Sequence, residues 1–253
     1  MHSKGYTLIG LFLLIWSHAI YAQELKIAAG LTRAPYLMSK SQSGIEVDIV
    51  KESLRKSGYT TNFKYFPYRL GFAQFNQGKF DAILTANAAL PINNGFYSTP
   101  YVSYENVVIT LAEKQHTITH LEQMSTMRIV SFPEAQKYLG PAYKTMTLSS
   151  PSYKEFNNHS KQILMLFTGR TDAIVLDINI FKYFFNQLKT TNVSLNLDKP
   201  ITVHRLFDKF DFSVAFKDQQ VRDDFNAAFA SLKKAERVQA IVDSYVSVPA
   251  AGN

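Results

Sequence analysis

The chain has 253 residues, with 27 Lys and Arg against 20 Asp and Glu, a formal net charge of +7, and no cysteine. The lack of cysteine excludes disulfides, Cys-ligated zinc and thiolate catalysis. The basic residues are scattered and are not interleaved with aromatic side chains in one stretch, so the charge does not indicate nucleic-acid binding. We interpret it as a property of the surface that favours solubility.

Residues 1–22 have the composition of a secretory signal peptide. A short basic start precedes an apolar run from Leu8 to Trp16, and Ala22 ends a step typical of signal-peptidase cleavage. Two polar residues interrupt the apolar run before it is long enough to span a bilayer comfortably. We therefore expect a cleaved signal, a mature chain that begins at Gln23 and a periplasmic location. An uncleaved membrane anchor is the alternative.

The first part of the mature chain alternates between strand and helix patterns. Strands are predicted over residues 25–29, 61–65 and 82–85, and helices over residues 45–54 and 70–77. This alternation favours a parallel α/β sheet.

A β-branched run at residues 104–111 is long enough to cross into a second lobe. The pattern beyond it predicts a helix over 119–124, a strand over 128–131, a helix from 133, a strand over 145–148 and a helix over 160–168. A return crossing near residues 196–204 and two terminal amphipathic helices would complete the first lobe. We thus expect lobe 1 at residues 23–108 plus 204–249 and lobe 2 at residues 109–203.

Two short segments repeat 91 positions apart. Residues 75–84 read FNQGKFDAIL, and residues 167–175 read FTGRTDAIV. In both segments a glycine, Gly78 or Gly169, is suited to a left-handed helix cap, and the Asp-Ala-Ile run enters a buried strand. Two similar α/β lobes are the economical explanation. Chance similarity is the alternative, because helix-glycine-strand units are common.

Five segments together carry a family resemblance. In chain order they read GIEVDIVKESLRKSG, GKFDAILTANAAL, YSTPYVSYENVVIT, LFTGRTDAIVLD and FSVAFKDQQVRDDFNAAFASLKK. They are similar to the family 3 extracellular solute-binding proteins, typified by periplasmic amino-acid receptors of ABC importers. The resemblance implies a two-lobed clamshell with two hinge crossings, each lobe a mostly parallel sheet flanked by helices. It also implies a monomer that binds a small molecule and contacts an inner-membrane ABC permease or sensor, with no metal, cofactor or nucleic acid.

The resemblance also implies ligand contacts in lobe 1. Relatives place an aromatic side chain thirteen residues before the Asp of the Gly-x-x-Asp turn, and counting back from Asp81 gives Tyr68. Its alternative role is core packing. Relatives often have another aromatic two residues before a proline, where this chain has Arg33 before Pro35. Arg33 is suited to an anionic ligand group or to stacking; a solvated position is the alternative.

The ends of the two repeat strands are further candidates, because ligands of open α/β sheets bind beyond the carboxyl ends of strands. These ends are Thr85 and Asn87 in one lobe and Asp177 in the other. Asp177 matches the family carboxylate that accepts hydrogen bonds from a ligand amino group, and a structural ion pair is its alternative. Asp81 and Asp172 precede buried strands and are expected to fix turns.

Two departures from the family argue against a plain α-amino acid as ligand. The arginine that pairs with the ligand carboxylate is expected after the third strand, yet no Lys or Arg occurs from Ala82 to Glu113. In lobe 2, Pro133 removes a backbone donor and Glu134 would compete for the helix start. Either Arg33 or Arg69 replaces the missing cation, or the ligand lacks a carboxylate there.

The leading hypothesis is a binding protein that captures a small polar solute for an ABC-type importer or a membrane sensor. A dehydratase-like enzyme on the same fold is a second hypothesis, with Glu134, Asp177 or His204 as acid–base candidates. Their spacing singles out no catalytic pair, so we assign no catalytic residue, and His204 is expected to be structural. An interaction module without a small ligand is the third hypothesis.

Overall fold

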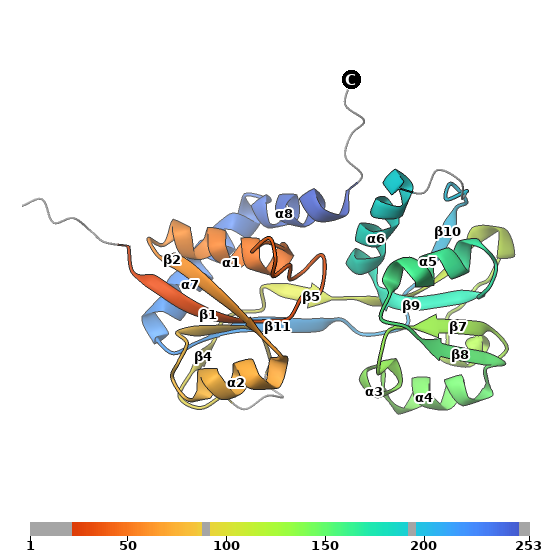
Figure 1. Cartoon of the computed structure of the whole chain (residues 1–253), viewed down its shortest axis with the longest axis horizontal. Coiled ribbons are helices and arrows are strands. Elements are labelled where there is room, and N and C mark those ends of the chain that lie inside the picture. Colours follow the sequence, from red (N-terminus) through yellow and green to blue (C-terminus); the bar gives the residue numbers. More distant parts are fainter. Residues whose placement is uncertain (1–21, 88–91, 192–195, 248–253) are drawn as a thin grey trace, which may run out of the picture.

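The computed structural model describes residues 22–87, 92–191 and 196–247, which form two lobes (Figure 1). The sheet of lobe 1 has the strand order β2-β1-β3-β11-β4, with β5 paired to β11, and the sheet of lobe 2 has the order β10-β6-β9-β7-β8. In lobe 1, β1 is parallel to β2 and β3, and in lobe 2, β7 is parallel to β8 and β9. The predicted two-lobed α/β fold is confirmed. Both sheets are mixed rather than mostly parallel, because β11 is antiparallel to β3, β4 and β5, and β6 is antiparallel to β9 and β10.

Lobe 1 contains the first strands and the last helices of the chain. Its strands are β1 (Glu24–Gly30), β2 (Thr60–Phe66), β3 (Ala82–Ala86), β4 (Phe96–Tyr97), β5 (Val102–Tyr104) and β11 (Phe210–Phe216). Its helices are α1 (Ile45–Lys56), α2 (Tyr68–Asn76), α7 (Gln219–Lys234) and α8 (Arg237–Val246). Every residue of β3 is buried, as expected of a central strand covered by helices on both faces.

Lobe 2 contains the middle of the chain. Its strands are β6 (Asn106–Leu111), β7 (Arg128–Ser131), β8 (Ser152–Glu155), β9 (Ala173–Asp177) and β10 (Ile201–His204). Its α-helices are α3 (Ala135–Tyr138), α4 (Gly140–Ser149), α5 (His159–Phe167) and α6 (Ile178–Thr191), and its 3₁₀ helices are η1 (Ala112–Lys114) and η2 (Leu121–Met124).

The strand predicted over residues 145–148 is wrong, because these residues belong to α4. Pro141 lies in the first helical turn, and the buried side chains of Tyr143, Met146 and Thr147 follow the spacing of one helix face. The helix predicted over residues 119–124 is only the short 3₁₀ helix η2. The predicted return crossing also needs correction, since β10 pairs with β6 inside lobe 2 and the chain crosses after this strand.

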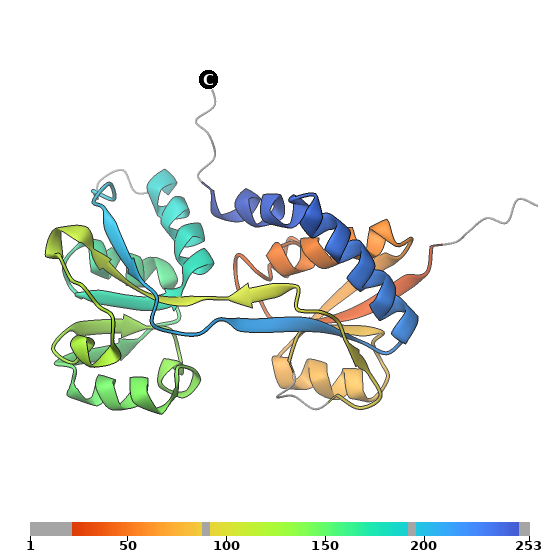
Figure 2. The same ribbon diagram turned by 180° about the vertical axis from the view of Figure 1, so that it is seen from behind.

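The two crossings lie side by side between the lobes, as Figure 2 shows for the β5–β6 segment and the segment that leads into β11. Glu105 lies between β5 and β6. Its Oε1 accepts a hydrogen bond of 2.8 Å from Arg205 Nε, and its Oε2 is 3.7 Å from Lys209 Nζ. Both cations belong to the second crossing, so Glu105 links the two crossings, which together form a hinge.

The repeated segments form the same local structure in both lobes. Gly78 and Gly169 have left-handed φ angles of 74° and 68°. Asp81 accepts the Lys26 backbone N–H at 2.7 Å, and Asp172 accepts the Arg128 backbone N–H at 2.8 Å. In both lobes the backbone N–H of the aspartate donates in return to the same partner, at 2.9 Å. The expectation that these aspartates fix turns is confirmed.

One buried hydrophobic cluster runs through both lobes, with Leu25 and Phe225 from lobe 1 and Ile174 and Leu188 from lobe 2 among its members. Helices α6 and α8 contact each other between the lobes, where Asn186 donates a 2.8 Å hydrogen bond to a backbone carbonyl of α8. Figure 1 shows α2 and α3 on the facing sides of the two lobes, away from this contact. The lobes therefore touch on the α6–α8 side, and α2 and α3 face each other on the opposite side.

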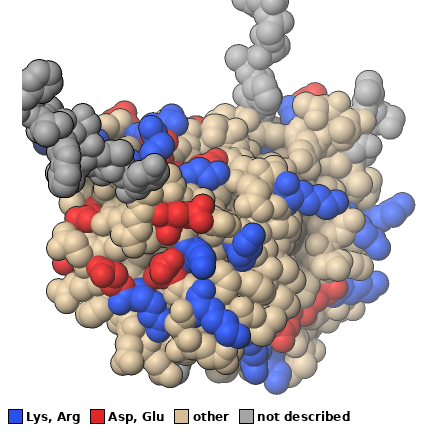
Figure 3. Space-filling view, turned by 60° about the vertical axis from the view of Figure 1, so that its left-hand side comes forward, with Lys and Arg blue, Asp and Glu red and all other residues tan. Residues whose placement is uncertain are grey.

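The predicted signal peptide lies outside the described residues except for Ala22. Within the described ranges, no helix combines the length and apolar character needed to cross a membrane. On the face seen in Figure 3, Lys and Arg side chains are intermixed with Asp and Glu, in agreement with the scattered charge of the sequence.

Candidate ligand-binding site

The end of β3 in lobe 1 is built around the carboxyl group of Glu46, which lies in the first turn of α1 and is fully buried. Its Oε1 accepts a 2.6 Å hydrogen bond from the Tyr104 hydroxyl, and its Oε2 accepts from the Thr85 hydroxyl at 2.7 Å and from the Tyr101 hydroxyl. These bonds replace the hydration that the carboxyl group loses. Burial, followed by the proximity of Glu46, raises the pKa of Tyr101 and Tyr104 well above the ordinary value, so both hydroxyls stay protonated as donors.

Thr85 has a left-handed backbone, with a φ of 56°. A β-branched residue in this region carries strain on the order of 1–3 kcal/mol. All of its polar groups are hydrogen-bonded: besides the bond to Glu46, its N–H donates to the Tyr101 hydroxyl at 3.4 Å and its carbonyl accepts from the Tyr68 hydroxyl at 2.6 Å. These bonds stabilise the strained end of β3 and fix the position of Tyr68.

Arg33 lies at the exposed edge of this network, in the loop after β1. Its Nη1 donates to the Tyr104 hydroxyl at 3.4 Å, and its guanidinium carbon is 5.5 Å from the centre of the Tyr104 ring. Partial loss of water around the guanidinium group lowers the pKa of Arg33, but the nearby Tyr104 and Glu46 outweigh this effect and the pKa lies above its ordinary value. The side chain has five N–H donors, so most remain available to a ligand.

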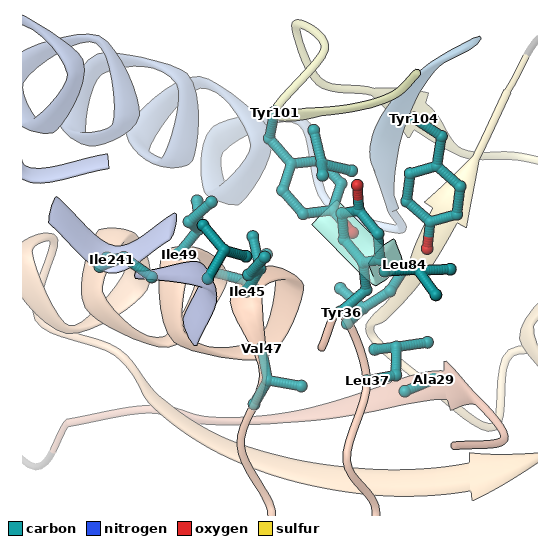
Figure 4. Close-up of a cluster of buried hydrophobic side chains, with 14 of the residues drawn as sticks. Ala29, Tyr36, Leu37, Ile45, Val47, Ile49, Leu84, Tyr101, Tyr104 and Ile241 are labelled. Atoms are coloured by element: carbon teal, nitrogen blue, oxygen red, sulfur yellow. The ribbon is translucent and has the colours of Figure 1, made fainter. Parts of the chain in front are cut away.

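Tyr36 connects this network to lobe 2. Its buried ring stacks on Tyr104 with the ring centres 4.1 Å apart, and Figure 4 shows both rings with Tyr101 in the buried cluster of lobe 1. The Tyr36 hydroxyl donates to Asp177 Oδ1 at 2.9 Å and accepts from Asn179 Nδ2 at 3.1 Å. A loop of lobe 1 is thereby bonded to the start of α6.

Asp177 ends β9 and accepts four hydrogen bonds from the protein itself. Its Oδ1 accepts the backbone N–H groups of Asn179 at 2.9 Å and Ile180 at 3.0 Å in addition to Tyr36, and its Oδ2 accepts the N–H of Glu105 at 2.9 Å. The side chain is 4% exposed, and burial raises its pKa to about 6 despite these bonds. In this structure Asp177 thus caps α6 and fixes the beginning of β6.

Helices α2 and α3 lie on the facing sides of the lobes (Figure 1); α2 begins at Tyr68 and α3 ends at Tyr138. Tyr68 is partly buried, with its ring centre 4.8 Å from that of Phe72, and burial raises its pKa. Tyr138 is 56% exposed.

The start of α3 is filled by Glu155 of β8. The Glu155 carboxyl group accepts the backbone N–H of Glu134 at 2.7 Å and that of Gln136 at 3.4 Å. We expected the side chain of Glu134 to compete for this helix start, but it points to Lys137, 3.5 Å away. The prediction named the wrong residue: the carboxyl group that occupies this helix start belongs to Glu155 of β8 and not to Glu134.

The other predicted site residues border the same region. Arg69 follows Tyr68 in α2, is exposed, and forms no ion pair or side-chain hydrogen bond within the described part of the chain. Asn87 directly follows β3 and is partly buried. The structure thus groups Arg33, Tyr68, Arg69, Thr85 and Asn87 along one edge of lobe 1, with Asp177 connected to it through Tyr36.

Each of the proposed acid–base groups Glu134, Asp177 and His204 contacts another group of the protein. His204 is buried in β10, where its Nε2 is 3.0 Å from the Thr110 hydroxyl and its Nδ1 accepts the Ile118 N–H at 3.4 Å, as expected of a structural histidine. Among the residues that the structure describes, no cluster of three or more His, Asp or Glu side chains is arranged to hold a metal ion.

The sequence reasoning missed Glu46, Tyr36, Tyr101, Tyr104 and Tyr138. A signal for Glu46 was present, because it occupies the buried helix face shared by Ile49, Val50 and Ser53. A carboxyl group on such a face requires buried donors. The four tyrosines had no comparable signal, since their partners are far away in the chain.

Two α/β lobes on a double-crossing hinge, with polar side chains at the facing strand ends, define a protein of the periplasmic-binding type. The sequence match is in agreement: residues 25–248 match the bacterial extracellular solute-binding proteins, family 3. The chain belongs to this family. A search of curated proteins gave no match.

Solved structures share the fold at low sequence identity. A substrate-binding protein of a polar amino acid ABC uptake transporter from Streptococcus thermophilus is 16% identical, with a TM-score of 0.67 over 88% of this chain and 86% of that chain. The unliganded, open L-cystine solute receptor of Neisseria gonorrhoeae is 14% identical, with a TM-score of 0.65 over 88% and 93%. An ancestral cationic amino acid solute-binding protein is 16% identical, with a TM-score of 0.67 over 88% and 96%.

Proposed function

We propose that this protein captures a small polar solute between its lobes and passes it to an ABC-type importer or presents it to a membrane sensor. The observation that carries the proposal is the hydrogen-bond network at the end of β3, which positions Arg33 and Tyr68 in a hinged member of a solute-binding family. A solute that contacts both lobes stabilises the closed arrangement, because those contacts form only when the lobes come together.

The solute in this proposal is not a plain α-amino acid. Three features support this: no Lys or Arg occurs from Ala82 to Glu113, Glu155 fills the start of α3, and Asp177 is engaged by protein donors. We propose Arg33, Tyr68, Arg69 and Asn87 as ligand contacts. Thr85 and Asp177 act in this proposal by positioning other groups.

We propose a binding protein without enzymatic activity, exported by a cleaved signal and acting in the periplasm as a monomer beside an inner-membrane permease or sensor. Family membership and the signal-like residues 1–22 support this. Asp177 and His204 are buried and hydrogen-bonded to other groups of the protein. This gives no support to the dehydratase-like alternative, because an acid–base group must reach its substrate.

A thermal-shift screen of amino acids, amines, short peptides, sugars and organic acids tests the proposal. A true solute at about a hundredfold excess over its Kd stabilises the protein by about 2.7 kcal/mol. We expect Arg33→Ala and Tyr68→Ala to reduce this stabilisation and Lys79→Ala, on an exposed turn of the same lobe, to retain it. If a hit stabilises the site variants as much as the parent, the site is wrong. Tight binding of standard α-amino acids would contradict the proposed kind of solute.

A further inference from the structure

We infer that the site selects an organic anion with an apolar or aromatic body and without an ammonium group. This inference rests on the proposed function and names the chemical class of the solute. It follows from which charged groups at the facing edges are already bonded and which are available.

Among the residues that the structure describes at this site, the buried or paired carboxyl groups leave an ammonium group no ready ionic partner. Glu46 is fully buried under three hydroxyl donors, Glu105 is paired with the cations of the second crossing, and Glu155 is occupied by the start of α3. Asp177 is buried, with three hydrogen bonds on Oδ1 and one on Oδ2, so an ammonium group could reach it only by displacing a protein group such as Tyr36. That ring is itself fully buried and stacked on Tyr104. Displacing it would cost both the stacking and a buried hydrogen bond.

An anionic group, in contrast, finds a prepared partner in Arg33. The guanidinium group is fixed over the Tyr104 ring by one long hydrogen bond and lies at an exposed edge. Its planar set of donors fits a carboxylate, sulfonate or phosphate group through two parallel hydrogen bonds. Because the start of α3 is filled by Glu155, the anion is recognised from lobe 1 alone.

The parts of the two lobes that face each other also carry exposed apolar side chains. Leu31, two residues before Arg33, is 56% exposed, Leu70 in the first turn of α2 is 46% exposed, and Tyr138 of the opposite lobe is 56% exposed. Apolar side chains combined with a few polar groups are the usual lining of a site for a small molecule. An anion with an aromatic or branched apolar body would bury these side chains when the lobes approach.

Isothermal titration of the mature chain with a matched series tests the inference. The series contains 3-phenylpropionate, L-phenylalanine and 3-phenylpropylamine, together with benzoate, benzylamine and propionate. We expect the acids to bind at millimolar concentration or below, L-phenylalanine to bind at least about tenfold more weakly than 3-phenylpropionate, and the amines not to bind. Arg33→Gln should weaken the acids about tenfold or more, and Tyr138→Ala should weaken 3-phenylpropionate more than it weakens propionate. Lys79→Gln is the matched control and should bind as the parent does.

The inference is overturned if neither acid binds, or if an amine or L-phenylalanine binds as tightly as its matched acid. The proposed function still holds in that case if a solute of another class binds in the wider screen and if its binding is weakened by Tyr68→Ala. If no solute of any class binds, the proposed function fails together with the inference.

Discussion

The two lobes begin their repeated strands in the same way and end them differently. At the start, Asp81 and Asp172 each exchange hydrogen bonds with the backbone of the adjacent strand. At the end, lobe 1 places the strained Thr85 over a buried carboxyl group from another helix, whereas lobe 2 places Asp177 at the start of its own next helix. The repeat therefore fixes how the strands enter the sheets and leaves their ends free to differ.

This difference separates two uses of a buried carboxyl group. Glu46 gathers side-chain hydroxyls, and one of these, on Tyr104, orients Arg33 toward the exposed edge. Asp177 gathers mainly backbone N–H groups, which fix a helix and a strand. Ligand recognition is thus expected to depend on lobe 1, and the following predictions test that division.

The largest effect is expected for Glu46→Ala. The change leaves the buried hydroxyls of Thr85, Tyr101 and Tyr104 without their acceptor, and we expect the free energy of unfolding to fall by about 3–5 kcal/mol. Urea denaturation measures this value. Glu46→Gln keeps one acceptor oxygen and should lose less. A loss below about 1 kcal/mol for the alanine variant would show that the network is not important for stability.

Asp177→Asn should change how stability depends on pH. The folded pKa of Asp177 is raised to about 6 from 3.8, so its contribution to stability is fully present below pH 4 and is lost as the pH rises through 6. Relative to the asparagine variant, which can still cap α6, the parent should lose up to about 3 kcal/mol across this window. Denaturation at several pH values measures the difference. Parallel pH profiles for the two proteins would contradict the prediction.

Tyr36→Phe removes the hydroxyl that joins the lobes at Asp177. We expect a loss of about 1–2 kcal/mol in unfolding free energy. Because the Tyr36 hydrogen bond lowers the pKa of Asp177, this pKa should rise further in the variant. Carboxyl carbon NMR titration follows it directly, and an unchanged midpoint would mean that the bond across the lobes is not formed in solution.

The smallest effect is expected at the strand starts. Asp172 has a lowered pKa, mainly because of the Arg128 side chain, whereas Asp81 accepts only a backbone N–H among its described bonds. Asp172→Asn should therefore destabilise the protein slightly more than Asp81→Asn at pH 7. The difference should shrink as the pH falls through the lowered pKa, since the parent then loses the ionised carboxylate. Equal losses for the two variants at pH 7 would contradict this.

The sequence predicted the fold correctly where residues close together in the chain determine the structure. Short sequence patterns predict the two glycine turns and the buried strand β3. From these turns and strands we could also predict where the strands end. Helix α4 was misread because its Thr145-Met146-Thr147-Leu148 run has strand-like composition, although its burial has helical spacing. The Tyr36–Asp177 bond joins residues 141 positions apart, so no local pattern indicates it.

The central claim is that a solute bound at the Arg33 edge draws the two lobes together. Because the chain has no cysteine, spin labels can be attached specifically through Ala73→Cys on α2 and Lys144→Cys on α4, both exposed. Double electron–electron resonance then measures the distance between the labels. We predict that a saturating solute found by the screen shortens this distance in the parent and leaves it unchanged in Arg33→Gln at the same concentration. A solute that binds the labelled parent without shortening the distance would contradict the claim.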